Sequence, residues 1–467
     1  MFSDWHDKLE NVQNYSNDDT TVQETTQDLP AREEWMLLSD LIPGVFVTTD
    51  QSQQIVNSHY NWQSDRLKYQ QSKIKEMSSW IKTNKESFTS TIRTEQNTDI
   101  STFSDMQKCA YDIIKRHSQK PYPKDPLLLI IIGGGATGKS YLINAVKNLL
   151  QQSCAVTATT GKAAFNIHGC TIHSLLKLPV AAKGNKDLTG QSVIRLQNSL
   201  KEIRYIIIDE YSMLGQKMFA WVDKRCRQAT GLTDQLFGGM SIILVGDPAQ
   251  LPPVADKPLY HSKPSTTLQE QGHLAYFMFN TVVKLTLNQR VKGSNPQQAT
   301  FRNLLNRLRT GDCNKDDWNL LLTRQPSTAP NVTEFENAIR LYYSNEEVAN
   351  YNFQKLTSLQ QPIAKINARH STAAAKNISA EEMSGLEPVV FLAKGAHVML
   401  TMNLWTDVGL CNGATGTIVE FIYASNQQPL IYPLLSLLNL MTTQGHLLLI
   451  EFQDVYQYVQ SQQHITH

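Results

Sequence analysis

The sequence predicts an α/β protein built around a doubly wound parallel sheet, and three observations lead to this fold class. Short apolar runs recur between residues 127 and 245, as expected of strands buried on both faces of a parallel sheet. Segments whose apolar residues recur at helical spacing lie between those runs. A glycine-rich turn connects the first run to the next helical segment, as at the start of a βαβ unit.

The elements of this domain are expected in the following order. A helix is predicted over 102–118, with Ser104 as its N-cap and apolar residues such as Ala110 and Ile114 on one face. The unbroken apolar run Leu127–Ile132 then predicts the first buried strand. The further elements expected are the helix Ser140–Leu150 and the strands Ala155–Thr159, Tyr205–Ile208 and Ser241–Val245.

The second half predicts a smaller block and then a small β-barrel. The block opens with Lys284–Leu287 and includes a helical stretch, Thr300–Arg309, that ends at Gly311. Short β-like runs separated by Gly and Asn turns then indicate a barrel, namely Val389–Leu392, His397–Thr401, Thr417–Phe421 and Leu447–Phe452. We predict an acidic, polar and partly disordered leader, the main domain, the smaller block, the barrel and a tail, over 1–95, 96–285, 286–385, 386–455 and 456–467.

Composition and charge place the chain among folded globular proteins. Apolar residues make up 41% and charged residues 18% of the 467 residues, enough for two or three domains with sizeable cores. The net charge is only +1, so a nucleic-acid partner would need a local basic groove. Residues 1–34 hold nine acidic residues against Lys8 and Arg32, a net charge of −7, which leaves +8 for the rest.

No targeting or membrane segment is predicted. The acidic start argues against a mitochondrial transit peptide, and no apolar stretch follows Met1 as in a secretory signal. Polar residues interrupt the most apolar late stretch, Pro429–Phe452, so it is a poor membrane span. The six cysteines form no CxxC pair, which fits neither a disulfide framework nor a zinc site and suits a reducing compartment.

The segment GGGATGKS, residues 133–140, predicts a phosphate-binding loop. It fits the pattern GxxxxGK[ST] and has the required context, after a strand and at the start of a helix. Glycines let backbone N–H groups turn toward phosphate oxygens, and the helix N-terminus adds positive potential. Lys139 can reach the β- and γ-phosphates, and Ser140 can ligate Mg²⁺. The alternative is a plain glycine-rich turn. The predicted nucleotide contacts here are Gly133, Gly135, Thr137, Gly138, Lys139 and Ser140.

Two later strand ends predict the groups that act on the nucleotide. In IIIDEYSM, Asp209 ends a strand and is expected to hold the metal, while Glu210 is expected to activate the attacking water as general base. The stretch Phe237–Val254 brings Gln250 to the same sheet edge, where an amide can sense the γ-phosphate and orient water. The alternatives are a solvated acidic turn and a proline-bounded loop.

These motifs, in this order, resemble the Pif family of superfamily-1B 5′→3′ DNA helicases, specifically the helicase part of Helitron-type transposon proteins. The resemblance covers the chain from about residue 100 to 420. It rests on GGGATGKS, TATTGKAAFNIHGCTIHS, IIIDEYSM, GGMSIILVGDPAQLPPV, LTLNQR, RLYYSNEEVANYN and LAKGAHVMLTMNLWTDVGLCNGATG. It implies two RecA-like P-loop NTPase motor domains, the second carrying a small SH3-like β-barrel insertion, with ATP and Mg²⁺ as cofactors.

The resemblance also implies roles for residues outside the phosphate loop. Gln107 matches the family's adenine-reading glutamine, although an exposed helical Gln would explain it as well. Arg290 matches the arginine of the second motor domain that reaches the γ-phosphate. Two basic clusters are interpreted as solvated helix faces rather than DNA contacts, namely Lys224, Arg225 and Arg227, and Arg302, Arg307 and Arg309. The residues that resemble the family's DNA-contacting motifs are Thr159, Thr160, Gly161, Lys162, Thr171, His173 and Ser174.

The chain departs from the family pattern after the predicted barrel. The family continues with segments like TIHKSQG and YVALSR, neither of which occurs before His467, and Tyr432–Gly445 is foreign to the pattern. We therefore expect an incomplete second motor domain, truncated before the last two helicase motifs.

The favoured function is an ATP-dependent DNA helicase that moves 5′→3′ on single-stranded DNA. The alternatives are a truncated DNA-binding ATPase that does not unwind and an ATPase switch with a protein partner. We expect a nuclear monomer that acts on single-stranded DNA and forked duplex DNA. Its work would lie in DNA repair, recombination, telomere maintenance or transposition.

Overall fold

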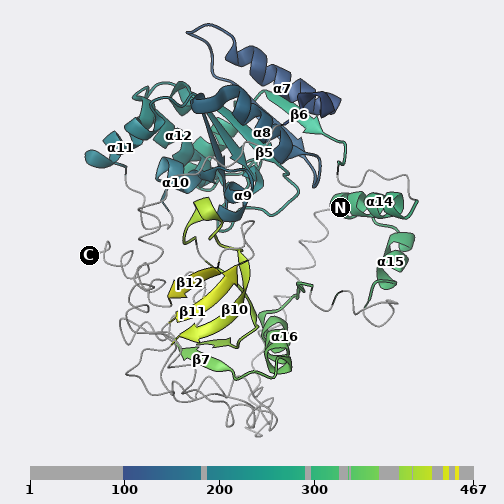
Figure 1. Ribbon diagram of the computed structural model, residues 1–467. Coiled ribbons are helices and arrows are strands. Elements are labelled where there is room, and N and C mark those ends of the chain that lie inside the picture. The colour runs from purple at the N-terminus through teal and green to yellow at the C-terminus, as the bar shows by residue number, and fades with distance from the viewer. Residues whose placement is uncertain are drawn as a thin grey trace, which may run out of the picture.

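The structure is a computed structural model, and it describes most of the chain after residue 97. The described residues are 98–179, 187–289, 296–325, 335, 338–367, 389–401, 403–422, 435–440 and 447–451. The predicted leader, 1–95, and the predicted tail, 456–467, lie outside them. A large α/β body comes first, and smaller helical and antiparallel β elements follow it (Figure 1).

The α/β body is organised around a six-stranded sheet of order β3-β2-β4-β5-β1-β6, whose strands are all parallel. The central strands β4 and β5 are buried along their whole length, as the apolar runs predicted. The strands are β1 (Leu128–Gly133), β2 (Cys154–Ala158), β3 (Cys170–Thr171), β4 (Tyr205–Asp209), β5 (Ser241–Gly246) and β6 (Thr281–Leu285).

Helices cover both faces of this sheet, so the predicted doubly wound arrangement is confirmed. Alternate residues of β1 face opposite cores: Ile130 packs in one, and Leu129 and Ile131 pack in the other. On the Ile130 side lie α10 (Ile172–Leu176), α11 (Gln191–Leu200), α12 (Gln216–Thr230) and α13 (Thr267–Phe277). On the other side lie α7 (Asp105–Ser118), α8 (Lys139–Leu150) and α9 (Gly161–Asn166).

Local sequence explains where the first helix starts. Ser104 is the N-cap of α7, and its hydroxyl accepts a hydrogen bond from the backbone N–H of Gln107. The Gln107 side chain in turn accepts from the Ser104 backbone N–H, which completes a capping box. The predicted cap and helix are therefore confirmed.

Strand β6 was not predicted from the sequence, although it lies within the range 96–285 predicted for the first domain. Lys284–Leu287 was expected to open the second block, but Lys284 and Leu285 belong to β6, which pairs in parallel with β1. A lone alternating strand at a sheet edge has no sequence signal that says which sheet it joins. The first sheet therefore has two strands, β3 and β6, beyond the four that the buried runs predicted.

Close packing of α12 against α13 depends on a glycine. A Cβ placed on Gly272 of α13 would lie 1.9 Å from the backbone oxygen of Gln216 in α12. We expect Gly272→Ala to lower the free energy of unfolding by about 1–3 kcal/mol, because backbone on both sides must shift. Urea unfolding measures this. Gln271→Ala, at an exposed position of the same helix, should change it by less than about 0.5 kcal/mol; equal effects of the two changes would contradict this packing.

The remaining elements follow the α/β body. Three helices come first: α14 (Pro296–Thr310), α15 (Lys315–Leu322) and α16 (Asn345–Ser358). The predicted strands are confirmed within two residues at their ends, and Leu435–Leu440, inside the stretch that is foreign to the family pattern, forms a further strand between two of them. The strands are β7 (Ala364–Asn367), β8 (Val389–Leu392), β9 (His397–Met399), β10 (Thr415–Ile422), β11 (Leu435–Leu440) and β12 (Leu447–Glu451).

These strands form antiparallel sheets of two and four strands, of orders β7-β8 and β12-β11-β10-β9. Whether they close into an SH3-like barrel stays a prediction. Five short 3-10 helices complete the described elements: η1 (Ile100–Thr102), η2 (Gln151–Ser153), η3 (Tyr211–Met213), η4 (Leu236–Gly239) and η7 (Thr406–Val408).

The second half packs on helix α9 of the α/β body. A Cβ on Gly409 would lie 2.8 Å from the ring of Phe165, and one on Gly161 would lie 2.2 Å from Oδ1 of Asn403. The contact is therefore close enough to need glycine on both sides. Figure 1 shows the loop above β10 approaching α9 at this point.

The interpretation of the basic clusters as solvated helix faces is wrong for Arg225, whereas the other members are exposed or half-buried and most of them form ion pairs. Arg225 is 2% exposed and stacks on Trp221. Lys224 pairs with Asp187 at 2.8 Å. Arg227, Arg307 and Arg309 each pair with an aspartate, namely Asp223, Asp317 and Asp247. Helical periodicity alone does not show these partners, because most of them lie on other elements.

The membrane and cysteine predictions can be compared with the described residues. None of the helices in the described ranges combines the length and hydropathy that a bilayer span requires. All six cysteines are free thiols. No cluster of three or more His, Cys, Asp or Glu side chains suited to a metal occurs in the part of the chain that the structure describes.

Candidate nucleotide-binding site

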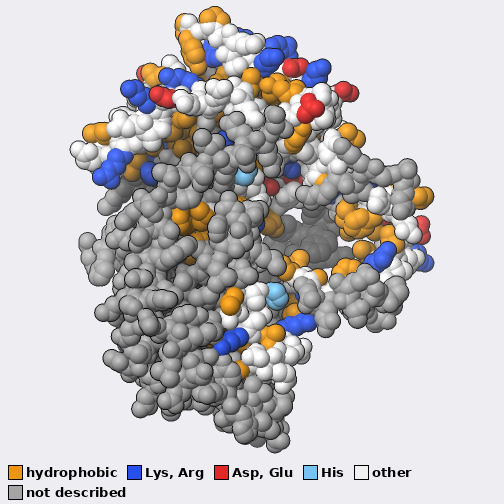
Figure 2. All heavy atoms as spheres, in the orientation of Figure 1, with side chains coloured by type: hydrophobic (Ala, Val, Ile, Leu, Met, Phe, Trp, Pro, Cys, Tyr) orange, Lys and Arg blue, Asp and Glu red, His pale blue; other side chains and the backbone are white. Residues whose placement is uncertain are grey.

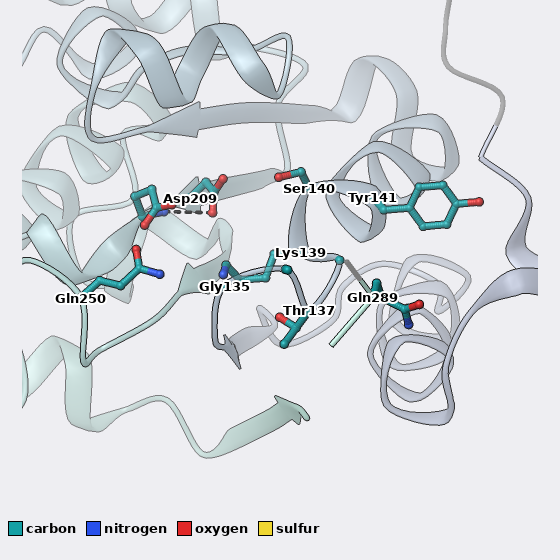
Figure 3. Close-up of a pocket in the computed structure, with 11 residues that line it drawn as sticks. Gly135, Thr137, Lys139, Ser140, Tyr141, Asp209, Gln250 and Gln289 are labelled. Carbon is teal, nitrogen blue, oxygen red and sulfur yellow. Dashed lines mark hydrogen bonds between the residues drawn. The ribbon is translucent and has the colours of Figure 1, made fainter. Parts of the chain in front are cut away.

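A pocket of about 440 Å³ opens at the carboxyl ends of β1, β4 and β5 (Figure 3). Ligands of open parallel sheets bind at this edge, because loops from several strands converge there. Its lining is mostly polar and comes from four stretches of the chain. The lining residues are Gly135, Ala136, Thr137, Gly138, Lys139, Ser140, Tyr141, Asp209, Glu210, Gln250 and Gln289.

The predicted phosphate loop forms one wall of this pocket. Gly138 has a φ of 80°, a left-handed conformation that glycine adopts without strain. A Cβ on Gly133 would lie 2.4 Å from Oγ1 of Thr137, so the loop closes tightly on its first residue. The ammonium of Lys139 donates to the carbonyls of Gly133 and Gly134 at 2.8 and 3.1 Å. Its positive charge is thus held inside the curl of the loop, where phosphate oxygens would lie.

The two predicted acids enter from the end of β4. Asp209 is 5% exposed, and its Oδ1 accepts from the backbone N–H of Glu210 at 3.0 Å. Burial, and then the neighbouring Glu210 charge, raise the pKa of Asp209 to about 6, although Lys139 and the Glu210 amide act in the opposite direction. Glu210 itself has a φ of 54°, which is uncommon for a residue with a side chain. This backbone turn directs consecutive acids into one pocket.

The site fits the predicted Mg²⁺. The hydroxyl of Ser140 and the carboxylate of Asp209 line the same pocket, and both are hard oxygen donors of the kind that Mg²⁺ prefers. Two protein ligands are enough, because Mg²⁺ keeps several waters and binds phosphate oxygens as well. A cation there would also favour the ionised form of Asp209.

Gln250 reaches the pocket from the loop after β5. Its backbone N–H donates to the Asp247 carbonyl at 2.9 Å, and its Nε2 lies 3.4 Å from Oδ2 of the same residue. Asp247 is 1% exposed, so it is a buried anchor for this loop. The structure therefore brings Gln250 to the same pocket as Lys139 and Glu210, as the sequence analysis predicted.

Three lining residues were missed by the sequence analysis: Ala136, Tyr141 and Gln289. Tyr141 directly follows the phosphate-loop motif, but its ring points away from the other lining side chains in Figure 3. Its hydroxyl bonds the backbone of Asp99. Gln289 lies in LTLNQR, and its backbone N–H donates to the Ala136 carbonyl at 2.7 Å. Its position inside that motif is the sequence feature from which its place in the pocket could have been predicted.

Among the predicted nucleotide contacts that the structure describes, Gln107 and Gly133 do not belong to this lining. Gln107 is 2% exposed, so it is not an exposed helical residue, and its Nε2 donates to the Gly138 carbonyl at 3.2 Å. It therefore buttresses the phosphate loop, and its adenine-reading role stays a prediction. Arg290 lies outside the described residues, directly after Gln289.

The predicted DNA-contacting residues lie at the ends of β2 and β3. Thr160 and Thr171 are the N-caps of α9 and α10, so their side-chain oxygens accept from the helices they start. The hydroxyl of Thr159 donates to the Glu210 carbonyl at 3.2 Å. Burial lowers the pKa of His173, which favours a neutral ring. Gly161 is buried, Lys162 is exposed, and DNA contact by this group stays a prediction.

Comparison with known proteins agrees with this geometry. Residues 101–319 match the family described as PIF1-like helicase, and residues 388–421 match the DNA helicase Pif1 2B domain. The chain belongs to the PIF1-like helicase family. The resemblance inferred from the motifs is therefore confirmed at the level of the family. The more specific likeness to Helitron-type members stays a prediction.

Named PIF1-like relatives are longer than this chain. The ATP-dependent DNA helicase PIF1 of Xenopus laevis is 29% identical over 309 residues, which are 64% of this chain and 45% of that protein. The helicase of the same name from Saccharomyces cerevisiae is 30% identical over 302 residues, 62% of this chain and 33% of that protein. The chain thus spans less than half the length of these relatives.

Solved structures support the fold. The Pif1 helicase from Candida albicans superposes with a TM-score of 0.54 and 22% sequence identity. The match covers 75% of this chain and 77% of that one. At this identity the similarity supports the RecA-like arrangement of the parallel sheet and its helices.

Proposed function

We propose that this chain is an ATP-dependent DNA helicase, in which ATP hydrolysis drives 5′→3′ movement on single-stranded DNA. One observation carries the proposal: a single pocket joins the phosphate-loop Lys139 to the acids Asp209 and Glu210 and to Gln250. These are the groups that phosphoryl transfer to water requires. The names of the PIF1-like relatives, ATP-dependent DNA helicases, support the same activity.

Each group has a task in the proposed hydrolysis. Lys139 and the loop amides would hold the phosphates, while Ser140 and Asp209 would hold Mg²⁺, which neutralises charge on the transferring phosphoryl group. Glu210 would accept a proton from the attacking water. Gln250 would orient that water or the γ-phosphate without the repulsion that a carboxylate would cause.

The proposed DNA-binding residues are mechanically connected to this chemistry. The Thr159 hydroxyl donates to the carbonyl of Glu210, the proposed base. If DNA binding moved the segment after β2, this hydrogen bond would therefore change the position of Glu210. Thr159, Thr160 and Lys162 lie at the carboxyl end of β2, beside the pocket edge of the sheet. This connection supports a DNA-stimulated enzyme more than an ATPase switch that answers only to a protein partner.

The charge pattern supports a local DNA track. On the face shown in Figure 2, Lys and Arg side chains of the upper body are scattered among Asp and Glu. Contacts to DNA would then come from hydroxyls, backbone amides and a few cations. Single-stranded and forked DNA as partners, a monomeric state, a nuclear location and a role in DNA repair, recombination or telomere maintenance belong to this proposal.

DNA binding tests the proposal directly. We expect the chain to bind a labelled single-stranded oligonucleotide more tightly than a blunt duplex, because strand-end loops contact one backbone. The logarithm of affinity should fall linearly with the logarithm of salt concentration, by about 0.7 per phosphate contact. Fluorescence anisotropy at several salt concentrations measures both. Lys162→Ala should reduce this slope by about 0.7, which corresponds to the loss of one phosphate contact.

Lys201→Ala is the matched control, because Lys201 is exposed at the far end of α11 and has no predicted contact. The same protein should displace a strand from a duplex with a 5′ single-stranded tail in the presence of ATP, and not from one with a 3′ tail. Equal affinity for duplex and single strand would refute the proposed track. Binding and hydrolysis without strand displacement would identify a DNA-dependent ATPase that does not unwind.

A further inference from the structure

An ion pair joins helix α14 to the strand end behind the pocket. Asp247 follows β5 and is 1% exposed, and Arg309 lies in the last turn of α14. Both terminal nitrogens of the guanidinium donate to the two carboxylate oxygens of Asp247. Burial acts to raise the pKa of Asp247, but the hydrogen bonds from Arg309 and the Ala249 amide hold that pKa below its ordinary value. The pair is thus closed, charged and bidentate.

The other bonds of Asp247 lead into the pocket. Its Oδ1 accepts from the backbone N–H of Ala249 at 3.1 Å, and its Oδ2 lies 3.4 Å from Nε2 of Gln250. Gln250 lines the pocket together with Lys139 and Glu210. A continuous set of contacts therefore runs from Arg309 through Asp247 to Gln250.

The same ion pair lies against the phosphate loop. A Cβ on Gly134 would lie 3.8 Å from Nη1 of Arg309 and 4.0 Å from Oδ2 of Asp247. Gln289, which precedes α14 in the chain, bonds the carbonyl of Ala136 in the same loop. The segment that follows the parallel sheet thus approaches the phosphate loop at two separate points.

Arg307 offers a comparison on the same helix. It also makes a bidentate pair with an aspartate, since its Nε and Nη2 donate to Asp317 at 2.6 and 2.5 Å. That pair joins α14 to α15, and neither of its residues lines the pocket. Substituting Arg307 therefore tests the effect of losing an ion pair of α14, and substituting Arg309 tests the effect of losing the ion pair that leads to the pocket.

We propose that Arg309 is a positioning residue for nucleotide turnover, which holds Asp247 and thereby fixes the Gln250 carboxamide in the pocket. This inference rests on the proposed hydrolysis of ATP by that pocket. A bidentate guanidinium restrains both oxygens of Asp247, so the side chain that Gln250 contacts keeps one orientation. Without the guanidinium, the buried carboxylate of Asp247 can rotate, and the Gln250 amide is then no longer held in one orientation.

Steady-state ATP hydrolysis by purified variants of the full chain tests this role. Arg309→Met should lower kcat about 10- to 100-fold, because a misplaced group near the reacting atoms is costly. Binding of a fluorescent ADP analogue should stay close to that of the parent chain, since Arg309 does not line the pocket. Arg309→Lys should restore part of kcat, because the positive charge is kept. The restoration should be incomplete, because one ammonium cannot hold both oxygens of Asp247. In a Gln250→Ala background, Arg309→Met should cause no further loss.

Arg307→Met is the matched control and should leave kcat close to that of the parent chain. An equal loss in Arg307→Met would assign the effect to the stability of α14 and overturn the inference. A further loss in the Gln250→Ala background would also overturn it, because Arg309 would then act directly. If the parent chain hydrolyses ATP and Arg309→Met does so equally well, only this inference fails. A parent chain without hydrolysis would refute the proposed function, and this inference with it.

Discussion

Replacing Lys139 by alanine is expected to reduce ATP hydrolysis by about 100- to 1000-fold, the usual cost of removing a group that stabilises developing negative charge. Lys139 is the only Lys or Arg among the residues that line the pocket in the described part of the chain. Its ammonium is already held in the curl of the loop by the carbonyls of Gly133 and Gly134. Nucleotide affinity should fall as well, because the phosphates lose their one lysine contact.

Phosphate release and binding of a fluorescent nucleotide measure the two effects separately. Lys147→Ala is the matched control, because Lys147 lies on the same helix and its Nζ bonds the carbonyl of His168 instead. It should leave both quantities near those of the parent chain. Hydrolysis by Lys139→Ala within a factor of ten of the parent chain would contradict the assignment of the phosphate loop.

Much of the pocket could be predicted because its groups occupy strand ends. The phosphate loop, Asp209 and Gln250 each follow a buried apolar run, and parallel strands bring their carboxyl ends to one edge. Sequence spacing alone then places the groups together, and the pocket lining agrees. Gln107 contacts the phosphate loop at the Gly138 carbonyl. Its predicted contact with adenine stays a prediction.

Long-range contacts are the part that local patterns could not predict. Arg309 was interpreted as part of a solvated helix face, yet it pairs with Asp247, which lies 62 positions away in sequence. Strand β6 was not predicted as part of the sheet for a related reason, since its partner β1 lies far upstream. In both cases the deciding interaction is tertiary, so residue spacing within one element carries no signal for it.

Replacing Glu210 by glutamine is expected to stop turnover while nucleotide remains bound. The side chain keeps its size and its place in the pocket, but an amide cannot accept a proton from the attacking water, which costs about 10²- to 10⁴-fold. The Glu210 charge also helps to raise the pKa of Asp209, so its removal should favour the ionised form of Asp209. Metal ligation by Asp209 and Ser140, and with it the affinity for nucleotide, should therefore be preserved or improved.

Single-turnover hydrolysis and equilibrium binding of a fluorescent ATP analogue, both with Mg²⁺, distinguish this result from a general loss of the site. Glu202→Gln removes one carboxylate from an exposed position before β4 and should behave like the parent chain. Lys139→Ala and Glu210→Gln should then differ in kind, because the first weakens binding and the second does not. An active Glu210→Gln protein would show that another group removes the proton. Loss of nucleotide binding in that variant would instead mean that Glu210 is needed to hold the ligand, and the division of labour between Asp209 and Glu210 proposed above would be wrong.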